Sequence, residues 1–385
     1  MQITQQHWTP QGGWKVVREV PSAHKPQLVL VFGGRALVSD QKMFDEIKGM
    51  YPKADVLMCS TAGEIIGTTV ADDTISLTAI EFANTPVMYV ETTIADAAES
   101  RAKGESLAKQ LPQEGLAHAL VFSDGLKVNG TALVGGLVAN LPKDVVVTGG
   151  LVGDGADFKE TAVGMNGPGK PGTIVLLGLY GDAITVGHGS LGGWDPFGPE
   201  RTITKSRDNV LLEMDGKPAL DLYKTYLGEE KAKELPGSGL LFPINMTVTR
   251  PDGSSYVVVR TLLAVDEKEQ SMTFAGDMPE GAKAQLMRAN FDRLVGGAEG
   301  AAKSSISNIG GATVELAILI SCIGRKLVLK ERVEEETEAV QSVVGEQAAM
   351  AGFYSYGEIS PVAATEKQCE LHNQTMTITT LSEAT

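Results

Sequence analysis

The sequence predicts an α/β fold of mixed sheets with flanking helices, changing to an α+β arrangement in its second half. Three observations lead to this prediction. Short buried runs alternate with helical patterns over about the first 150 residues, strands then follow one another more closely, and many of the 44 glycines stand where apolar runs end. This alternation is typical of a largely parallel sheet covered by helices, and a chain of 385 residues favours two domains over one.

The first half alternates strands and helices. Buried runs that end in glycine or small polar residues predict strands at 27–32, 54–59, 74–82, 87–93, 118–122 and 144–148. Ser39 can serve as the N-cap of a helix over 40–50, and Pro112 closes a second helix over 95–111. A third helix is expected over 131–141.

Strands dominate from about residue 160 onward. Two runs, 161–165 and 172–180, flank a Gly/Pro loop and predict an antiparallel hairpin. Further strands are expected at 183–187, 201–206, 210–214, 244–249, 255–265, 271–275, 313–321, 351–360 and 375–381. Helices are expected at 218–227, at 282–306 with a break near Gly296-Gly297, and at 331–344, whose acidic side chains we expect to face solvent.

The charge balance disfavours two classes of partner. Lys and Arg number 33 against 48 Asp and Glu, which gives a formal net charge of −15. Such a chain repels phosphate backbones and anionic lipid surfaces, so we expect no nucleic acid and no membrane as partner. Three well-separated cysteines, no secretory leader and no apolar run near the ~20 residues of a membrane span favour a cytoplasmic protein.

Familiar enzyme motifs are absent or incomplete. The segment 164–170 has the spacing of a phosphate-binding loop, but Pro171 stands where that loop needs Ser or Thr, so it is better interpreted as a hairpin tip. Neither a G-x-S-x-G nor an H-E-x-x-H motif occurs. One enzymatic alternative stays open, in which Cys59 or Cys322 acts as a thiol nucleophile on a small metabolite.

An ordered set of short motifs carries a resemblance to a known family. The motifs are Cys59–Ile65, Ser123–Gly125, Gly149–Asp154, Gly193–Gly198, Asp215–Asp221, Ser321–Arg325, Gly352–Ile359 and Leu371–Thr375. Together they resemble the FIST sensory-domain family. The resemblance implies an N-terminal FIST domain over 25–200 and a C-terminal FIST domain over 201–385.

The resemblance implies a sensory protein without catalysis of its own. Free-standing members resemble nitric-oxide-sensing haem proteins that regulate a partner histidine kinase, and other members have been proposed to bind amino acids. We therefore expect a small ligand, either haem with nitric oxide or an amino-acid-like metabolite, and signalling through a separate protein. A homo-oligomer is compatible with the sequence.

The candidate ligand site lies where predicted strands end, because strand-end loops can hold polar groups above a rigid sheet. Glu64 or Glu358 with Arg325 would match the ammonium and carboxylate of an amino acid, although Arg325 and Glu358 could instead simply pair with each other. The candidate ligand-binding residues are Cys59, Ser60, Thr61, Gly63, Glu64, Trp194, Cys322, Arg325, Tyr354, Tyr356, Glu358 and Asn373. The interpretation requires the tips from both halves to meet at one cavity.

A haem would need an axial ligand, and His188 and His372 are the candidates because both lie in motif-rich segments. The alternative is that each is a hydrogen-bonded loop histidine. One further echo joins the halves: 60–65 and 354–359 both end in Gly-Glu-Ile, which is a weak sign of duplication.

Overall fold

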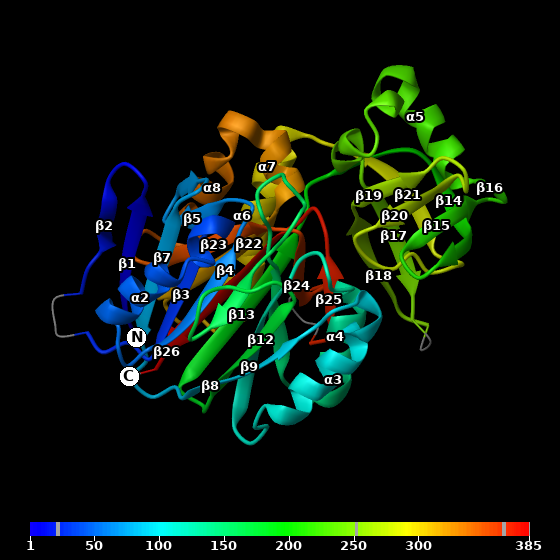
Figure 1. The fold of residues 1–385 in the computed structure, drawn as a ribbon. Helices are drawn as coiled ribbons and strands as arrows, with labels where there is room; N and C mark the ends of the chain where they lie inside the picture. The colour runs from blue at the N-terminus through cyan, green and yellow to red at the C-terminus, as the bar shows by residue number, and fades with distance from the viewer. Residues whose placement is uncertain (21–23, 251–252, 364–366, 385) are drawn as a thin grey trace.

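A computed structural model describes residues 1–20, 24–250, 253–363 and 367–384 (Figure 1). Three six-stranded mixed sheets form one body, and a separate antiparallel sheet stands at one end of it. The predicted mixture of helices and mixed sheets is therefore confirmed. The body consists of three units that follow one plan, and the third unit is interrupted by the extra sheet.

The first unit holds β1 (Gln2–Thr9), β2 (Gly13–Arg18), β3 (Leu28–Gly33), α1 (Arg35–Val38), α2 (Gln41–Met50), β4 (Asp55–Ser60), β5 (Glu64–Ile66), β6 (Thr69–Ala71) and β7 (Ile75–Glu81). The second holds β8 (Val87–Thr93), the 3-10 turn η1 (Ala97–Glu99), α3 (Ser100–Gln110), β9 (Leu116–Ser123), α4 (Gly130–Asn140), β10 (Val146–Leu151), β11 (Val163–Met165) and β12 (Thr173–Tyr180). Asp40 rather than Ser39 caps α2, and Asn129 caps α4.

The third unit holds β13 (Ile184–Leu191), α6 (Phe291–Ser307), β22 (Leu316–Cys322), α7 (Ile323–Leu329), η3 (Lys330–Arg332), α8 (Glu334–Val344), β23 (Ala349–Ser355), β24 (Gly357–Pro361), β25 (Cys369–His372) and β26 (Met376–Glu383). In each unit a parallel strand pair is connected through helical chain: β3 pairs with β4, β9 with β10, and β22 with β23. An antiparallel strand then returns beside the first of the pair, namely β7, β12 or β26.

The units exchange strands in a cycle. After its parallel pair, each unit sends a short strand into the next sheet: β5 pairs with β23, β11 with β4, and β24 with β10. The expected hairpin over 161–180 is therefore wrong, since β11 and β12 belong to different sheets. Apart from one bridge between Val163 and Lys170, the two runs pair elsewhere.

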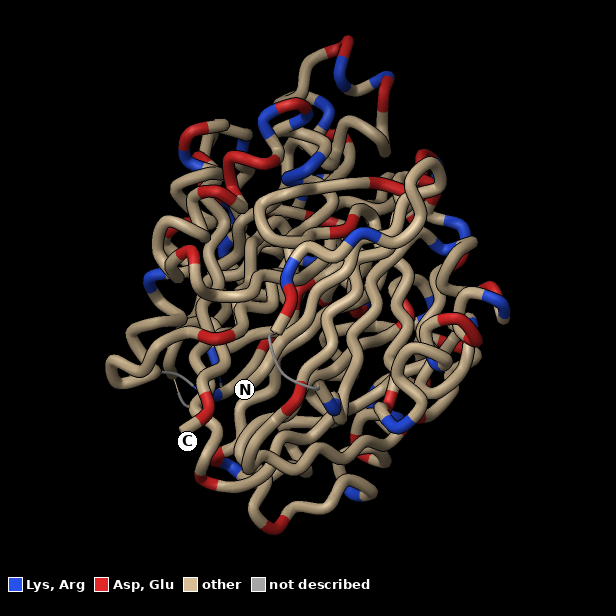
Figure 2. The backbone as a smooth tube through the Cα atoms, turned by 90° about the vertical axis from the view of Figure 1, so that its left-hand side faces the viewer, with Lys and Arg blue, Asp and Glu red and all other residues tan. Residues whose placement is uncertain are grey.

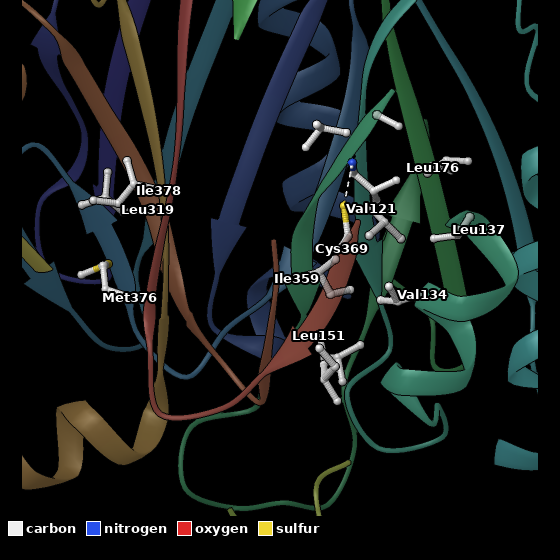
Figure 3. Close-up of a cluster of buried hydrophobic side chains, with 14 of the residues drawn as sticks. Val121, Val134, Leu137, Leu151, Leu176, Leu319, Ile359, Cys369, Met376 and Ile378 are labelled. Atoms are coloured by element: carbon white, nitrogen blue, oxygen red, sulfur yellow. Dashed lines mark hydrogen bonds between the residues drawn. The ribbon is translucent and has the colours of Figure 1, made fainter. Parts of the chain in front are cut away.

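The centre of the body is an apolar core to which all three sheets contribute. The rings of Phe32, Phe122 and Phe353 meet there. The ring centroids lie 6.0 Å apart for Phe32 and Phe122, 4.9 Å for Phe32 and Phe353, and 6.3 Å for Phe122 and Phe353. A second core lies where α4 covers its sheet, and Figure 3 shows Val134 and Leu137 of that helix near strand side chains. Residues at or just after the carboxyl ends of several parallel strands line the cavities described below.

The inserted segment holds β14 (Asp195–Arg207), β15 (Val210–Met214), β16 (Lys217–Pro218), α5 (Ala219–Lys233), η2 (Gly237–Leu241), β17 (Ile244–Thr249), β18 (Ser255–Arg260), β19 (Leu262–Asp266), β20 (Ser271–Phe274) and β21 (Lys283–Arg288). We call this segment, 195–288, the insert. It has its own core around Tyr223, Met246 and Phe274. The division expected at residues 200 and 201 falls inside β14, and chain from both sides of it forms the body.

Two helix predictions need correction. The helix expected over 282–306 is wrong in its first part, because Lys283–Arg288 pairs with β14 and β17, and the helix begins only at Phe291. It then passes Gly296-Gly297 without a break. The acidic helix α8 is present, but Glu336 is wholly buried rather than solvated.

Charged residues of both signs are spread along the chain, in helices and strands as well as in loops (Figure 2). Within the described parts of the chain, no helix is long and apolar enough to cross a membrane.

Candidate functional site

Two equivalent buried glutamates stand at the start of exchanged strands. Glu64 opens β5, where Thr61 Oγ1 donates to its Oε1 at 2.5 Å. The backbone N–H and hydroxyl of Thr74 donate to its Oε2 at 3.1 Å and 2.8 Å. Burial raises the pKa of Glu64 to about 7, although these hydrogen bonds act in the opposite direction.

Glu358 repeats this arrangement in β24. Ser355 Oγ donates to Glu358 Oε1 at 2.6 Å, and Thr375 donates to Oε2 from its backbone N–H at 3.2 Å and its hydroxyl at 2.9 Å. Burial raises the pKa of Glu358 to about 8. The repeated Gly-Glu-Ile sequence thus marks equivalent positions in two units, which gives the echo a structural meaning.

Glu64, but not Glu358, lines a large cavity at the strand ends. A cavity of about 700 Å³, which we call the strand-end cavity, lies where parallel strands of the body end. Its lining is Gly34, Arg35, Ala36, Thr61, Ala62, Gly63, Glu64, Asp72, Asp73, Asp154, Gly155, Ala156, Asp157, Ile323, Lys326, Leu327 and Lys330. Three candidate residues are therefore brought together here, Thr61, Gly63 and Glu64, and Glu358 is not among the lining residues.

Lys326 of α7 crosses one wall of this cavity. Its Nζ donates to the Ala62 carbonyl at 2.9 Å, forms an ion pair with Asp72, and lies 5.6 Å from the centre of the Tyr354 ring. Gly63 has φ +135°, and a Cβ there would lie 2.5 Å from Nζ. Glycine is thus required both by the backbone conformation and by the close approach of the lysine.

Asp154 forms another part of the wall and is linked to Tyr356. It accepts the backbone N–H groups of Lys159 and Glu160, both at 2.9 Å, and the hydroxyl of Tyr356. Phe158 stacks on the Tyr356 ring with centroids 4.6 Å apart. Burial raises the pKa of Tyr356, so this hydroxyl keeps its proton and donates it to Asp154.

Tyr356 also lines a second, smaller cavity of about 180 Å³ between the body and the insert, which we call the junction cavity. Cys322 lines it as well. Asn373 lies beside it, since its side-chain Oδ1 accepts the backbone N–H of the lining residue Thr261 at 3.4 Å. The candidate residues from the two halves therefore divide between two cavities.

Arg325 and Trp194 belong to the protein framework instead. Arg325 is wholly buried, and its guanidinium donates to Glu336 at 2.8 Å and 3.1 Å and to two backbone carbonyls. With these acceptors in place it cannot meet a ligand carboxylate, and it pairs with Glu336 rather than with Glu358. Trp194 donates its indole N–H to the Gln374 carbonyl at 2.8 Å and packs in a small core.

Three further candidates, Cys59, Ser60 and Tyr354, are buried and line neither of these two cavities. Ser60 Oγ accepts the N–H of Ala162 at 2.8 Å, and the Tyr354 hydroxyl donates to Glu336. Burial raises the pKa of Cys59 and of Cys322, so both thiols stay protonated near neutral pH. Since the thiolate is the reactive form, this geometry gives the cysteine-enzyme alternative no support.

The two candidate haem ligands do not fit that role. Among the described residues, neither His188 nor His372 lines either of the two cavities. His372 Nε2 lies 2.9 Å from the Ser360 carbonyl, and burial lowers its pKa to about 4. His188 is buried in β13, and burial likewise lowers its pKa. Within the described chain, no group of three or more His, Cys, Asp or Glu side chains could hold a metal ion.

Several lining residues escaped the sequence reasoning. Asp154 ends one of the family motifs, and Lys326 directly follows the candidate Arg325. The motifs therefore pointed to this part of the sequence, but not to these two side chains as members of the site. Asp72 and Asp73 lie in an ordinary polar turn of the sequence, where no spacing distinguishes them.

The structure is that of a mixed α/β protein with cavities at the ends of its strands. The comparison with family models matches the FIST N domain over residues 27–217 and the FIST C domain over residues 219–361. The chain belongs to the FIST family, whose domains are signal-transduction sensory domains that bind small ligands.

A comparison with curated proteins finds no match. Among solved structures, a cyanuric acid hydrolase from A. caulinodans is similar with a TM-score of 0.36 and 8% identity, over 94% of this chain and 91% of that one.

Proposed function

We propose that this protein senses a small, polar, amine-bearing metabolite, amino-acid-like in its charges, which binds in the strand-end cavity. The observation that carries the proposal is Glu64, a carboxyl group that is 1% exposed yet lines a cavity of about 700 Å³. Its equivalent, Glu358, makes the same hydrogen bonds without lining this cavity. Glu64 is therefore the member of the pair that a ligand in this cavity can reach.

The charges of the cavity suit a zwitterion. Five carboxyl groups line it, from Glu64, Asp72, Asp73, Asp154 and Asp157. Three cations, Arg35, Lys326 and Lys330, line it as well. Carboxylates favour an ammonium group, and the cations can receive a carboxylate, so both ends of an amino-acid-like molecule find partners.

Binding of an ammonium group should be coupled to a proton. The pKa of Glu64 is raised to about 7 by burial, and a cation beside it would lower that pKa again. The ligand therefore releases a proton from Glu64 when it binds below about pH 7, and its affinity increases as pH rises through that value.

A thermal-shift screen with the twenty standard amino acids and simple amines tests the site, because a ligand that binds only the folded state raises the melting temperature. Glu64→Gln should remove the shift, whereas the matched variant Glu358→Gln should keep it. A shift that survives Glu64→Gln, or one that both variants lose equally, would contradict the assignment.

The same proposal includes output through a separate protein such as a histidine kinase, which the family's sensory role supports. Binding would act by shifting the population between conformations that the partner distinguishes. Autophosphorylation of a candidate kinase should change on adding this protein and change again on adding the ligand. The Glu64→Gln variant should give the first change without the second.

A further inference from the structure

The junction cavity has a chemistry of its own. It lies between the body, which contributes Leu151, Cys322 and Tyr356, and the insert, which contributes Thr261 and Phe274. We propose that it is a second binding site, and that its ligand is an uncharged molecule with one aromatic ring and one hydroxyl group, of the phenol class. This site stands independently of the ligand proposed for the strand-end cavity.

The lining excludes a charged ligand. None of the described residues that line the junction cavity carries a charge, and most are apolar. The apolar members include Leu126, Leu151, Phe158, Leu263, Phe274 and Ala275. A carboxylate or ammonium group buried here would lose its hydration without finding a counter-charge.

The volume selects a single ring. The cavity measures about 180 Å³. A dry protein cavity of about 150 Å³ lined by Leu, Ile and Phe is large enough to bind benzene. One aromatic ring with a small substituent therefore matches the space, whereas a two-ring or cofactor-sized molecule exceeds it.

The mouth of the cavity exposes apolar side chains from both parts of the molecule. Leu126 is 40% exposed, Phe158 37% and Leu263 45%, and all three line the junction cavity. Leu126 and Phe158 belong to the body and Leu263 to β19 of the insert. Exposed apolar groups gathered around one opening are typical of a site that receives an apolar ligand.

A polar group inside the lining lacks a partner. Thr261 is buried, and its Oγ1 has no hydrogen-bond partner among the described residues. The neighbouring Asn373 is also buried, and its Nδ2 likewise has no hydrogen-bond partner among the described residues. Buried polar groups are nearly always satisfied in folded proteins, so an unpaired hydroxyl in a cavity wall indicates a place for a ligand hydroxyl.

Phenol, benzoate, cyclohexanol and toluene test the site with the intact chain, using calorimetry or ligand-observed NMR. Phenol should bind best. Benzoate should bind about tenfold more weakly or worse, because its charge finds no partner. Thr261→Val should lower the affinity for phenol several-fold and leave the affinity for toluene unchanged. Of these two molecules only phenol carries a hydroxyl group, which would lose its hydrogen-bond partner in this variant.

Two variants probe the space and the charge. Ala275→Leu fills the cavity and should lower phenol affinity by about tenfold or more, while Ala156→Leu in the strand-end cavity should not. Leu263→Lys alters an exposed side chain, so folding should be unaffected. The introduced charge in Leu263→Lys should lower the affinity for phenol and raise the affinity for benzoate. Absence of phenol binding in the millimolar range, or equal phenol binding by wild type, Ala275→Leu and Leu263→Lys, would overturn the proposal.

Discussion

Replacing Arg325 with methionine should strongly destabilise the protein without any ligand being involved. The guanidinium donates to Glu336 from Nε at 3.1 Å and from Nη2 at 2.8 Å, to the Leu294 carbonyl at 2.8 Å, and to the Gly192 carbonyl. Both charged side chains are 0% exposed. Methionine fills similar space but leaves the carboxylate without its cation and two carbonyls without a donor.

The magnitude follows from that burial. Removing one partner of a buried ion pair typically costs about 3–5 kcal/mol, because the remaining charge stays desolvated. We therefore expect Arg325→Met to lower the free energy of unfolding by about that amount. The double variant with Glu336→Leu should recover only part of the loss, because it removes the unpaired charge but leaves two backbone carbonyls and the Tyr354 hydroxyl without partners.

Urea denaturation followed by tryptophan fluorescence provides the assay. All three tryptophans, Trp8, Trp14 and Trp194, lie outside the insert, so the signal reports on the body. Arg332→Met is the matched control, because Arg332 pairs with Glu335 at the surface and such pairs contribute about 0–1 kcal/mol. A loss below about 1 kcal/mol for Arg325→Met would refute the argument that this arginine serves the framework.

Three further predictions concern the backbone and the second buried glutamate. Gly63→Ala should lower the free energy of unfolding by about 1–3 kcal/mol and displace the side chain of Lys326. Because Lys326 lines the strand-end cavity, the affinity for the ligand of that cavity should change as well. Gly352→Ala should cost about 3 kcal/mol or more, because its Cβ would lie 1.8 Å from a carbonyl oxygen of β22. Gly49→Ala, with open space in α2, should instead be mildly stabilising, and equal losses for both would contradict this reasoning. Since burial raises the folded pKa of Glu358 to about 8, the wild type binds more protons folded than unfolded. Relative to Glu358→Gln, it should lose stability as pH rises from about 4.5 to about 8, by up to about 1.4 kcal/mol per pH unit, in denaturation curves; parallel curves would argue against a raised pKa.

Local patterns predicted many strands, because Val-rich runs need no distant information to be recognised. The strand 87–93, for example, is β8 with the same bounds. The patterns missed β1 and β2, and each of the single strands expected over 255–265 and 351–360 is in fact two strands. The helix expected from 282 failed for a tertiary reason. Lys283–Arg288 consists mainly of good helix formers, and pairing with two strands of the insert overrides that propensity.

The candidate site was harder to predict, because its residues meet only through exchanged strands. Glu64 pairs with Phe353, which lies 289 positions further along the chain, and no local pattern encodes that pairing. The motif glycines and Glu64 were found because they closely follow the ends of predicted strands. Arg325 was misjudged since the sequence does not reveal that Glu336, in a helix that reads as acidic and solvated, is turned inward.

The cyclic exchange of β5, β11 and β24 makes the three units inseparable. Each unit completes its neighbour's sheet, so a unit expressed alone would expose an unpaired strand edge. It would also lack the two phenylalanine rings that the other units add to the central cluster. Proteolytic cleavage of a connector between two units should leave the fragments associated, because their strands remain paired in shared sheets. Each of the three sheets therefore depends on two units of the chain.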